Sequence, residues 1–402
     1  MPTNLCRSIL SGGSINMFDW SDCPSLSELP VSDVGLPRTP KAALTSHATQ
    51  GRRPRNKKAR IGVVGRTEVA ETKQKTLAVG SACSGWMAGT QALEKLGRHH
   101  EVLFACDTSH WVREFIRANF AVGNMVHSVY DDAFARLPHC DIFECGFPCQ
   151  PYSMEGARKG MADCRASTIK PVLKYIGLRR PTVVILENVP HFQGSPAYSK
   201  VLSQLRRVTD GSYVIKDGIL DSRNFGVPQN RKRWFLVAVQ RYALHTQLDF
   251  PTGSDVCVPL SGIYDLSSTA SPAEEPHQAI ARQHVANALA LCKASGTKAH
   301  KRPFVIDVGH GRKNDRGQDL VHMTYNCLPT ITATRASSRD YYFTQLRRRA
   351  RLVELARAQG AISRLNLQCI SARQMGHIVG NAITISVLAA LLKAVIECTH
   401  FG

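Results

Sequence analysis

The stretch "DIFECGFPCQPYSMEG", residues 141–156, combines a short apolar run with a rigid loop. In the loop, Cys149 stands one residue after a proline and two residues before another. Prolines restrict the main chain on both sides of the thiol. A buried structural cysteine gains nothing from this restriction, whereas a nucleophile at the end of a sheet strand gains exposure and a fixed direction. The loop therefore predicts a reactive Cys149.

Three further apolar runs of this kind occur along the chain, at residues 77–80, 102–106 and 183–186. They are separated by amphipathic stretches that suit helices, at 89–96, 111–120 and 169–179. Strands that alternate with helices predict an α/β fold with a doubly wound, mostly parallel sheet, similar to a Rossmann fold. Such sheets bind ligands at the carboxyl ends of their strands. The side chains that follow each run are therefore candidates for function.

Charged side chains stand next to two of the later strands, after one strand and before the other. Glu187 emerges directly from the apolar run of "PTVVILENVP", where burial raises the pKa of a carboxyl group and lets it hold a proton near neutral pH. A role of Glu187 and Asn188 as the N-cap of a helix is the alternative. Gln229, Arg231 and Arg233 alternate just before a strong strand, and alternation predicts two guanidinium groups aimed at one ligand.

Composition limits the class of protein. Lys and Arg outnumber Asp and Glu by 51 to 31, and the formal net charge of +20 suits a polyanionic partner such as nucleic acid. Thirteen scattered cysteines form no paired clusters, so neither a disulfide framework nor a zinc site is predicted. No apolar stretch has the length of a membrane span and the N-terminus lacks the apolar core of a signal peptide, so we expect an intracellular protein.

The chain divides into four predicted parts. Residues 1–75 form a disordered arm whose cluster "GRRPRNKKAR" is typical of a nuclear-import signal, a phosphate-binding arm or a solvated linker. Residues 76–241 form the catalytic domain, and residues 242–325 form a small separate lobe with a helix at 278–293. Residues 326–402 return to the catalytic domain, where the last amphipathic helix is expected to pack on the core.

Five motifs occur in order between residues 76 and 397, namely "GFPCQPYS", "ENV", "GVPQNRKR", "LPTITATR" and "GNAI". Together they resemble the cytosine-C5 DNA methyltransferase family, which has the class I fold of S-adenosylmethionine-dependent methyltransferases. The resemblance implies double-stranded DNA as the partner, S-adenosylmethionine as the methyl donor, and a target cytosine that is flipped out of the stack. The lobe at 242–325 then corresponds to the target-recognition region.

The resemblance also implies catalytic roles. Cys149 is the nucleophile that adds to C6 of cytosine. Glu187 contacts N3 of the ring. Arg233, with Arg231 nearby, holds the ring carbonyl and stabilises the charge that develops during attack. The positions that fill or brace the opened DNA strand are matched by Gln150, Thr330 and Thr332.

For the donor, the resemblance implies contacts from Asp107, which is expected to bind the ribose hydroxyls, and from Asn381. The family has Asp-x-Phe-x-Gly-x-Gly-Gly in the first loop, whereas this chain has "SACSGWMA" at 81–88 and keeps only one of those glycines. Gly89 follows and compensates in part. The donor-contacting residues expected in this loop are Ser84, Gly85 and Trp86. A second acidic contact is expected from Asp131 or Asp132.

Two alternatives stay open. One branch of the family methylates a tRNA, but its Cys-Phe-Thr motif and its Pro-Pro-Cys are absent here, which favours DNA. A catalytically weak regulatory homologue would explain the altered first loop, yet such a protein is expected to lose Cys149, Glu187 and the two arginines first. The basic arm fits a nuclear eukaryotic protein, and a restriction-modification role is the alternative.

Overall fold

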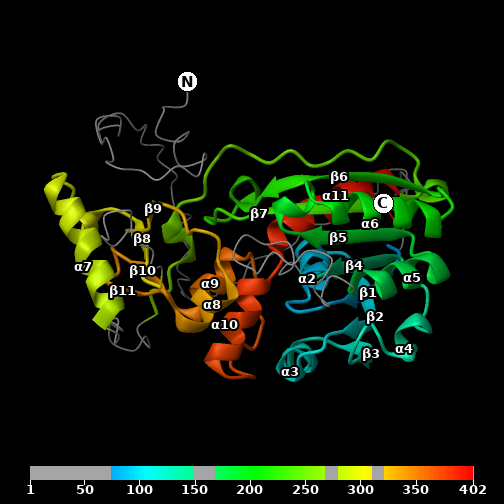
Figure 1. Cartoon of the computed structure of the whole chain (residues 1–402), viewed down its shortest axis with the longest axis horizontal. Coiled ribbons are helices and arrows are strands. Elements are labelled where there is room, and N and C mark those ends of the chain that lie inside the picture. Colours follow the sequence, from blue (N-terminus) through cyan, green and yellow to red (C-terminus); the bar gives the residue numbers. More distant parts are fainter. Residues whose placement is uncertain (1–73, 149–167, 268–278, 310–320, 402) are drawn as a thin grey trace, which may run out of the picture. The chain divides into compact units, whose positions relative to one another are not determined.

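A computed structural model describes residues 74–148, 168–267, 279–309 and 321–401, and its main feature is a seven-stranded sheet (Figure 1). The strand order is β3-β2-β1-β4-β5-β7-β6. Strands β1 to β5 run parallel, and β7 is antiparallel to both of its neighbours. The strands are β1 (Leu77–Ala82), β2 (His100–Cys106), β3 (Val122–Val126), β4 (Ile142–Gly146), β5 (Val183–Asn188), β6 (Tyr213–Asp221) and β7 (Lys232–Gln240). The predicted mostly parallel sheet is confirmed.

Helices cover both faces of this sheet because its strands are apolar on both sides. In β1, Leu77 and Val79 face one core, whereas Ala82 faces the other. The first core also contains residues of α2 (Ala88–Lys95), α3 (His110–Asn119) and α11 (Ile385–Cys398). The second contains residues of α4 (Asp132–Ala135), α5 (Ile169–Arg179) and α6 (Pro196–Val208). Burial on both faces is typical of parallel sheets, and it confirms the doubly wound arrangement.

A second, antiparallel sheet has the strand order β11-β10-β8-β9. Its strands are β8 (Phe304–Asp307), β9 (Met323–Tyr325), β10 (Tyr341–Phe343) and β11 (Arg348–Arg349). Helix α7 (Ala279–Ala294) packs on it, since Val285 and Ala288 share a small core with Ile306 and Tyr342. The sheet extends past the lobe boundary expected at residue 325, because β8 pairs with β10.

The C-terminal helices pack closely on one another. They begin with α8 (Ala333–Ser338), α9 (Leu352–Ala358) and α10 (Ala372–Asn381). A Cβ atom on Gly380 would lie 2.4 Å from the main-chain nitrogen of Ala333, and one on Gly376 would lie 2.5 Å from the carbonyl oxygen of Ala336, so both glycines let α10 approach α8. Helix α11 follows and is mostly buried, as expected for the last helix.

No single helix in the described ranges is long and apolar enough to cross a membrane, and α10 with α11 passes the test of length and composition only as a pair bent by 42°.

Candidate active site

Glu187 and Arg233 form an ion pair at the carboxyl end of β5. The register places Glu187 between Gly146 of β4 and Phe235 of β7. Its Oε1 lies 3.2 Å from Nε of Arg233, and the two side chains are 12% and 16% exposed. Burial raises the pKa of Glu187, while the charge of Arg233 and then that of Arg231 oppose the rise. The carboxyl group therefore sits at the sheet edge with a proton affinity above the ordinary value.

The alternative role of Glu187 and Asn188 as a helix N-cap is wrong. Both residues still belong to β5, and the short 3₁₀ helix that follows, Pro190–Phe192, has Val189 as its N-cap. The side-chain amide of Asn188 instead donates to the carbonyl oxygen of Phe147 at 3.2 Å. Asn188 thus holds the chain where it leaves β4, two residues before Cys149. Cys149 and Gln150 themselves lie outside the described residues.

Arg231 has a different environment from Arg233. It is 2% exposed, and its terminal nitrogens donate to the carbonyl oxygens of Ile331 and Ala382, each at 2.7 Å. The sequence predicted two guanidinium groups aimed together, but β7 begins only at Lys232, so strand alternation does not extend back to Arg231. The guanidinium group of Arg233 faces the carboxyl group of Glu187. That of Arg231 instead joins two main-chain segments through its hydrogen bonds.

The motifs "GVPQNRKR" and "LPTITATR" lie side by side. The N–H of Asn230 donates to the carbonyl oxygen of Leu328 at 2.8 Å, and the hydroxyl of Thr330 donates to the carbonyl oxygen of Asn230 at 2.7 Å. Gln229 is fully buried and donates to the side-chain oxygen of Gln359 at 3.1 Å. Thr332 is the N-cap residue of α8, and its main-chain N–H donates to the hydroxyl of Tyr341. This bracing fixes the segment that carries Arg231 and Arg233.

A second cluster of predicted residues lies at the carboxyl ends of β1 and β2. Ser84 is buried, and its hydroxyl accepts the N–H of Cys106 at 2.9 Å and lies 3.1 Å from two carbonyl oxygens, those of Ser81 and Cys106. These contacts join the loop to the ends of β1 and β2. Ser84 therefore fixes the conformation of the loop that follows β1.

Gly85 and Asp107 meet at this edge. One carboxylate oxygen of Asp107 accepts the N–H of Gly85 at 3.1 Å, and the other accepts the N–H of Ser109 at 3.0 Å. Burial raises the pKa of Asp107. Among the described residues, a Cβ atom on Gly85 would meet only the carbonyl oxygen of Cys83, at 3.8 Å, so these residues leave space for a ligand beside the main chain of the loop. Each oxygen of Asp107 retains a lone pair for a hydroxyl group.

Trp86 belongs to the hydrophobic core. Its indole is 2% exposed and stacks on Phe115, with ring centroids 5.3 Å apart and planes at 1°. Only the main chain of Trp86 is therefore available to a donor.

His377 is the functional candidate that sequence reasoning missed. Its ring lies 5.1 Å from that of Trp111, at 87°, and its Nδ1 lies 3.2 Å from the side-chain nitrogen of Asn381. The charge of Asp107 raises the pKa of His377, although burial outweighs it and the net shift is downward. Asp107, Asn381, Trp111 and His377 thus gather at one edge, although His377 lies in no motif that the sequence singled out.

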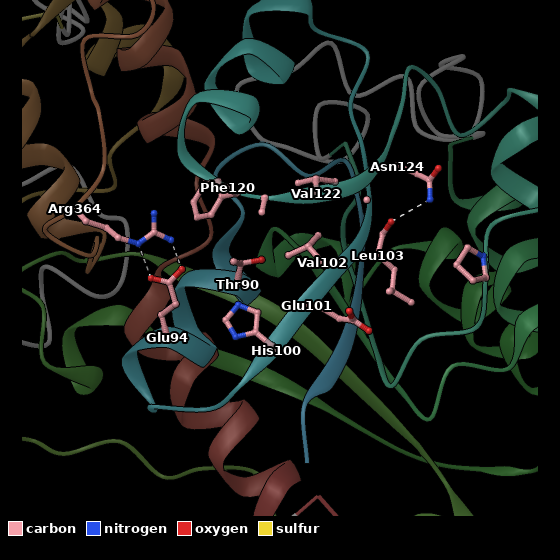
Figure 2. Close-up of a pocket in the computed structure, with 13 residues that line it drawn as sticks. Thr90, Glu94, His100, Glu101, Val102, Leu103, Phe120, Val122, Asn124 and Arg364 are labelled. Atoms are coloured by element: carbon pink, nitrogen blue, oxygen red, sulfur yellow. Dashed lines mark hydrogen bonds and ion pairs between the residues drawn. The ribbon is translucent and has the colours of Figure 1, made fainter. Parts of the chain in front are cut away.

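These two clusters occupy the same sheet edge. Asp107 follows β2 and Glu187 ends β5, so with β1 and β4 between them they are about 14 Å apart, three strand spacings. A cleft of about 690 Å³ lies elsewhere, along the first halves of β2 and β3 (Figure 2). Figure 2 shows Arg364 and Glu94 paired at its rim. Since loops at the carboxyl ends of parallel strands bind ligands, this cleft is not part of the candidate site.

The fold is similar to those of solved methyltransferases. The Entamoeba histolytica methyltransferase EhMeth superposes with a TM-score of 0.56 at 16% sequence identity, over 81% of this chain and 99% of that chain. A putative DNA modification methyltransferase encoded within a prophage of E. coli superposes with a TM-score of 0.57 at 17% identity, over 80% of this chain and 99% of that chain. At these identities the likeness shows the fold alone.

Curated relatives share more sequence. The type II methyltransferase M.NlaX of Neisseria lactamica is 27% identical over 156 residues, which are 39% of this chain and 50% of that protein. M.HpaII of Haemophilus parainfluenzae is 28% identical over 177 residues, 43% of this chain and 48% of that protein. The chain thus spans about half the length of these relatives. A family model matches residues 77–397, most of the chain, and on this match the protein belongs to the C-5 cytosine-specific DNA methylase family.

Proposed function

We propose that the protein is a DNA (cytosine-5)-methyltransferase that transfers a methyl group from S-adenosylmethionine to a flipped cytosine through a covalent bond between Cys149 and C6. The observation that carries the proposal is the ion pair of Glu187 and Arg233 at 3.2 Å. The pair lies at the carboxyl end of the sheet, beside the end of β4, and Cys149 follows β4 in the sequence. Asn188 binds the main chain of Phe147 directly after β4. A nucleophile, a carboxyl group and a guanidinium group are the parts that addition to a cytosine ring requires.

The chemistry assigns a separate task to each part. Carbon C5 of cytosine is a poor nucleophile, and addition of the Cys149 thiolate to C6 turns the ring into an enamine that attacks through C5. Glu187, with its raised pKa, donates a proton to N3 as negative charge develops there. Arg233 binds the ring carbonyl and stabilises the same charge. Removal of the C5 proton by a solvent base then breaks the bond between Cys149 and C6, and N3 returns its proton to Glu187, which restores the aromatic ring. Arg231 acts indirectly, by bracing the segment.

The residues at the ends of β1 and β2 fit the donor. The space beside Gly85 admits a ligand close to the main chain, and Asp107 can accept hydrogen bonds from ribose hydroxyls. When bound, S-adenosylmethionine supplies an electrophilic methyl group. The two acidic candidates beyond β3 are Asp131 and Asp132. We propose Asp131, because its negative charge contributes to the raised pKa of Cys106 and so lies near the end of β2. Asn381 and His377, which contact each other on α10, lie at the same end of the sheet.

Double-stranded DNA is the proposed substrate. The net charge of +20 favours a polyanion, and arginines and lysines that bind phosphates position a duplex without reading its sequence. The lobe predicted at 242–325, with the antiparallel sheet and α7, is proposed to read the target. Gln150, Thr330 and Thr332 are proposed to face the opened strand. The hydroxyl of Thr330 is engaged by Asn230, so Thr330 would act by bracing its segment.

Transfer of a labelled methyl group tests the substrate. The protein is incubated with labelled S-adenosylmethionine and either mixed-sequence duplex DNA or tRNA, in parallel with Cys149→Ser. We expect label in DNA only, and none with the variant. Label in tRNA but not in DNA would support the tRNA branch instead, and donor binding without transfer to either would support a regulatory homologue.

A covalent trap tests the nucleophile. Fluorine at C5 of cytosine blocks the final elimination, so duplex DNA that contains 5-fluorocytosine should remain bound to the protein on a denaturing gel. Cys257 is exposed and provides the control thiol. We expect Cys257→Ala to form the adduct and Cys149→Ala to form none. An adduct with Cys149→Ala would place the nucleophile elsewhere.

The basic cluster at 51–60 lies outside the described residues, and we propose nuclear import as its role if the protein is eukaryotic. A fluorescent protein fused to residues 1–75 tests this. Nuclear accumulation that disappears when the Lys and Arg residues of 51–60 are replaced by Ser is the expected result, and uniform distribution of the unaltered fusion would refute it.

A further inference from the structure

Glu144 is a buried carboxylate that the proposed mechanism does not use. It lies in β4 and is 5% exposed, on the face of the sheet that α2 covers. Its Oε2 accepts the main-chain N–H of Gly89 at 2.8 Å. A carboxyl group in the interior of a sheet is costly unless a partner compensates for its lost hydration, and here the partner is the first turn of a helix.

The carboxylate fits against Gly89 because this residue has no side chain. A Cβ atom at position 89 would lie 2.5 Å from Oε2 of Glu144 and 2.8 Å from its carboxyl carbon, so any other residue would displace the carboxylate. Helix α2 has no acidic residue in its first turn, and its N-cap residue Met87 makes no side-chain hydrogen bond. The carboxylate that complements the positive end of α2 therefore comes from a neighbouring strand.

The register of β1 and β4 places Glu144 beside the position of an acidic family residue that this chain lacks. Ser81 of β1 is the direct partner of Glu144 in the parallel pair of β1 and β4. Both side chains point to the same face, about 4.8 Å apart. Ser81 stands where the family has the acidic residue of Asp-x-Phe-x-Gly-x-Gly-Gly. The acidic group is missing from the motif, and a carboxylate is present one strand away.

We propose that Glu144 is a positioning residue for the methyl donor: it supplies from β4 the carboxyl group that the family carries on β1, and it holds the first turn of α2. The inference rests on the proposed function, since it concerns the loop that is to bind S-adenosylmethionine. Through Gly89, Glu144 anchors the beginning of α2, and the loop at 83–87 leads directly into that helix.

The loop needs such an anchor because its backbone is strained. Cys83 and Met87 both have left-handed conformations, with φ of 52° and 53°. This conformation is unfavourable for residues other than glycine, and Met87 occupies a position where the family has glycine. A fixed first turn of α2 keeps Met87 in this conformation. Without Glu144 the loop is expected to relax and to lose the space beside Gly85.

Substitution and transfer of the carboxylate test the proposal. The unaltered protein is compared with Glu144→Ala, Glu144→Gln and the double variant Ser81→Asp with Glu144→Ala, using the Kd for S-adenosylhomocysteine by calorimetry. We expect Glu144→Ala to weaken binding about tenfold or more, since the buried hydrogen bond from the Gly89 amide to Glu144 is lost. The double variant should recover most of this loss. Glu144→Gln keeps the shape and an acceptor oxygen, and should fall between the two.

A matched control separates positioning from stability. Leu205 is fully buried in α6, in the core on the other face of the sheet. Leu205→Ala should lower the melting temperature without changing the Kd. A Glu144→Ala protein that binds as tightly as the unaltered one would overturn the proposal, and so would a double variant that regains thermal stability but not affinity.

Failure of the proposed function gives a different result. An unaltered protein that binds neither S-adenosylhomocysteine nor S-adenosylmethionine would contradict the donor assignment. Hydrogen exchange of the Gly89 amide then decides on Glu144 independently. Faster exchange in Glu144→Ala, restored in the double variant, supports the anchoring role, and unchanged exchange overturns it.

Discussion

The side chain of Arg233 on β7 pairs with Glu187 on β5 at 3.2 Å, across two strands that run in opposite directions. Because β7 is antiparallel, its first residues arrive at the edge where the parallel strands end. A guanidinium group from the start of one strand thereby meets a carboxyl group from the end of another. Arg231, only two residues earlier, is directed into main-chain carbonyl groups instead. This difference leads to opposite expectations for the two arginines.

Arg233→Ala should strongly slow methyl transfer with little effect on folding. Loss of a charge-stabilising donor typically lowers kcat by about 10²–10³-fold. Removal of the guanidinium also raises the pKa of Glu187 further, because its largest opposing charge is gone. Single-turnover methylation across pH, with Arg233→Lys as the charge-retaining control, measures the effect. Full activity in Arg233→Ala would remove Arg233 from the site.

Arg231→Ala should lower stability first and activity as a consequence. Its guanidinium is 2% exposed and binds the carbonyl oxygens of Ile331 and Ala382. Each carbonyl oxygen that is left buried without a partner costs roughly 1–3 kcal/mol. Urea unfolding measures this cost. A variant with unchanged stability but no activity would show that Arg231 acts on the substrate.

Gly380→Ala should destabilise the protein through backbone collision. The added Cβ atom would lie 2.4 Å from the main chain of Ala333, so α10 and α8 must separate. Overpacking of this kind costs about 1–3 kcal/mol or more. Gly194→Ala is the control, since no atom of the described residues lies within 4 Å of its Cβ position. Equal melting temperatures for the two variants would contradict the close packing of α10.

Stability should fall as pH rises toward neutrality, partly because of Glu144. Burial raises its pKa from 4.5 to about 7, against the opposing effects of Ser81 and the Gly89 amide. The folded protein thus keeps a proton that the unfolded chain releases, so this contribution is fully present below the unfolded pKa and is lost as pH rises through the folded one. The melting temperature of the unaltered protein, relative to Glu144→Gln, should decline between about pH 5 and pH 7. A constant difference would contradict the raised pKa.

Sequence periodicity located most of the main sheet, because its strands are short and strongly apolar. Helix α5 begins and ends at the expected residues, 169 and 179. Strand β3 was missed, since "VGNMV" contains Gly and Asn and is largely exposed at the sheet edge. Helix α6 was also missed. Its sequence "PAYSKVLSQLRRV" has a start signal in Pro196 after the N-cap Ser195, which would have located it.

The site was predictable as far as single strands determine it. Glu187 and Asp107 follow apolar runs, and the ends of parallel strands meet at one edge. The roles of Arg231 and Trp86 were not predictable, because they depend on partners more than twenty residues away, such as Ala382 and Phe115. His377 has no local signal at all. It reaches the site through the packing of α10, which only tertiary structure shows.

The pairing of Ser81 with Glu144 also affects how related proteins are recognised. A motif written as a string of letters treats the loss of an acidic residue as the loss of a function, although an acidic residue stands on the adjacent strand. Two carboxylates on these register partners would repel each other, so a chain is expected to carry the acid on one strand or on the other. Profiles that score the two positions jointly would detect family members that a linear motif rejects.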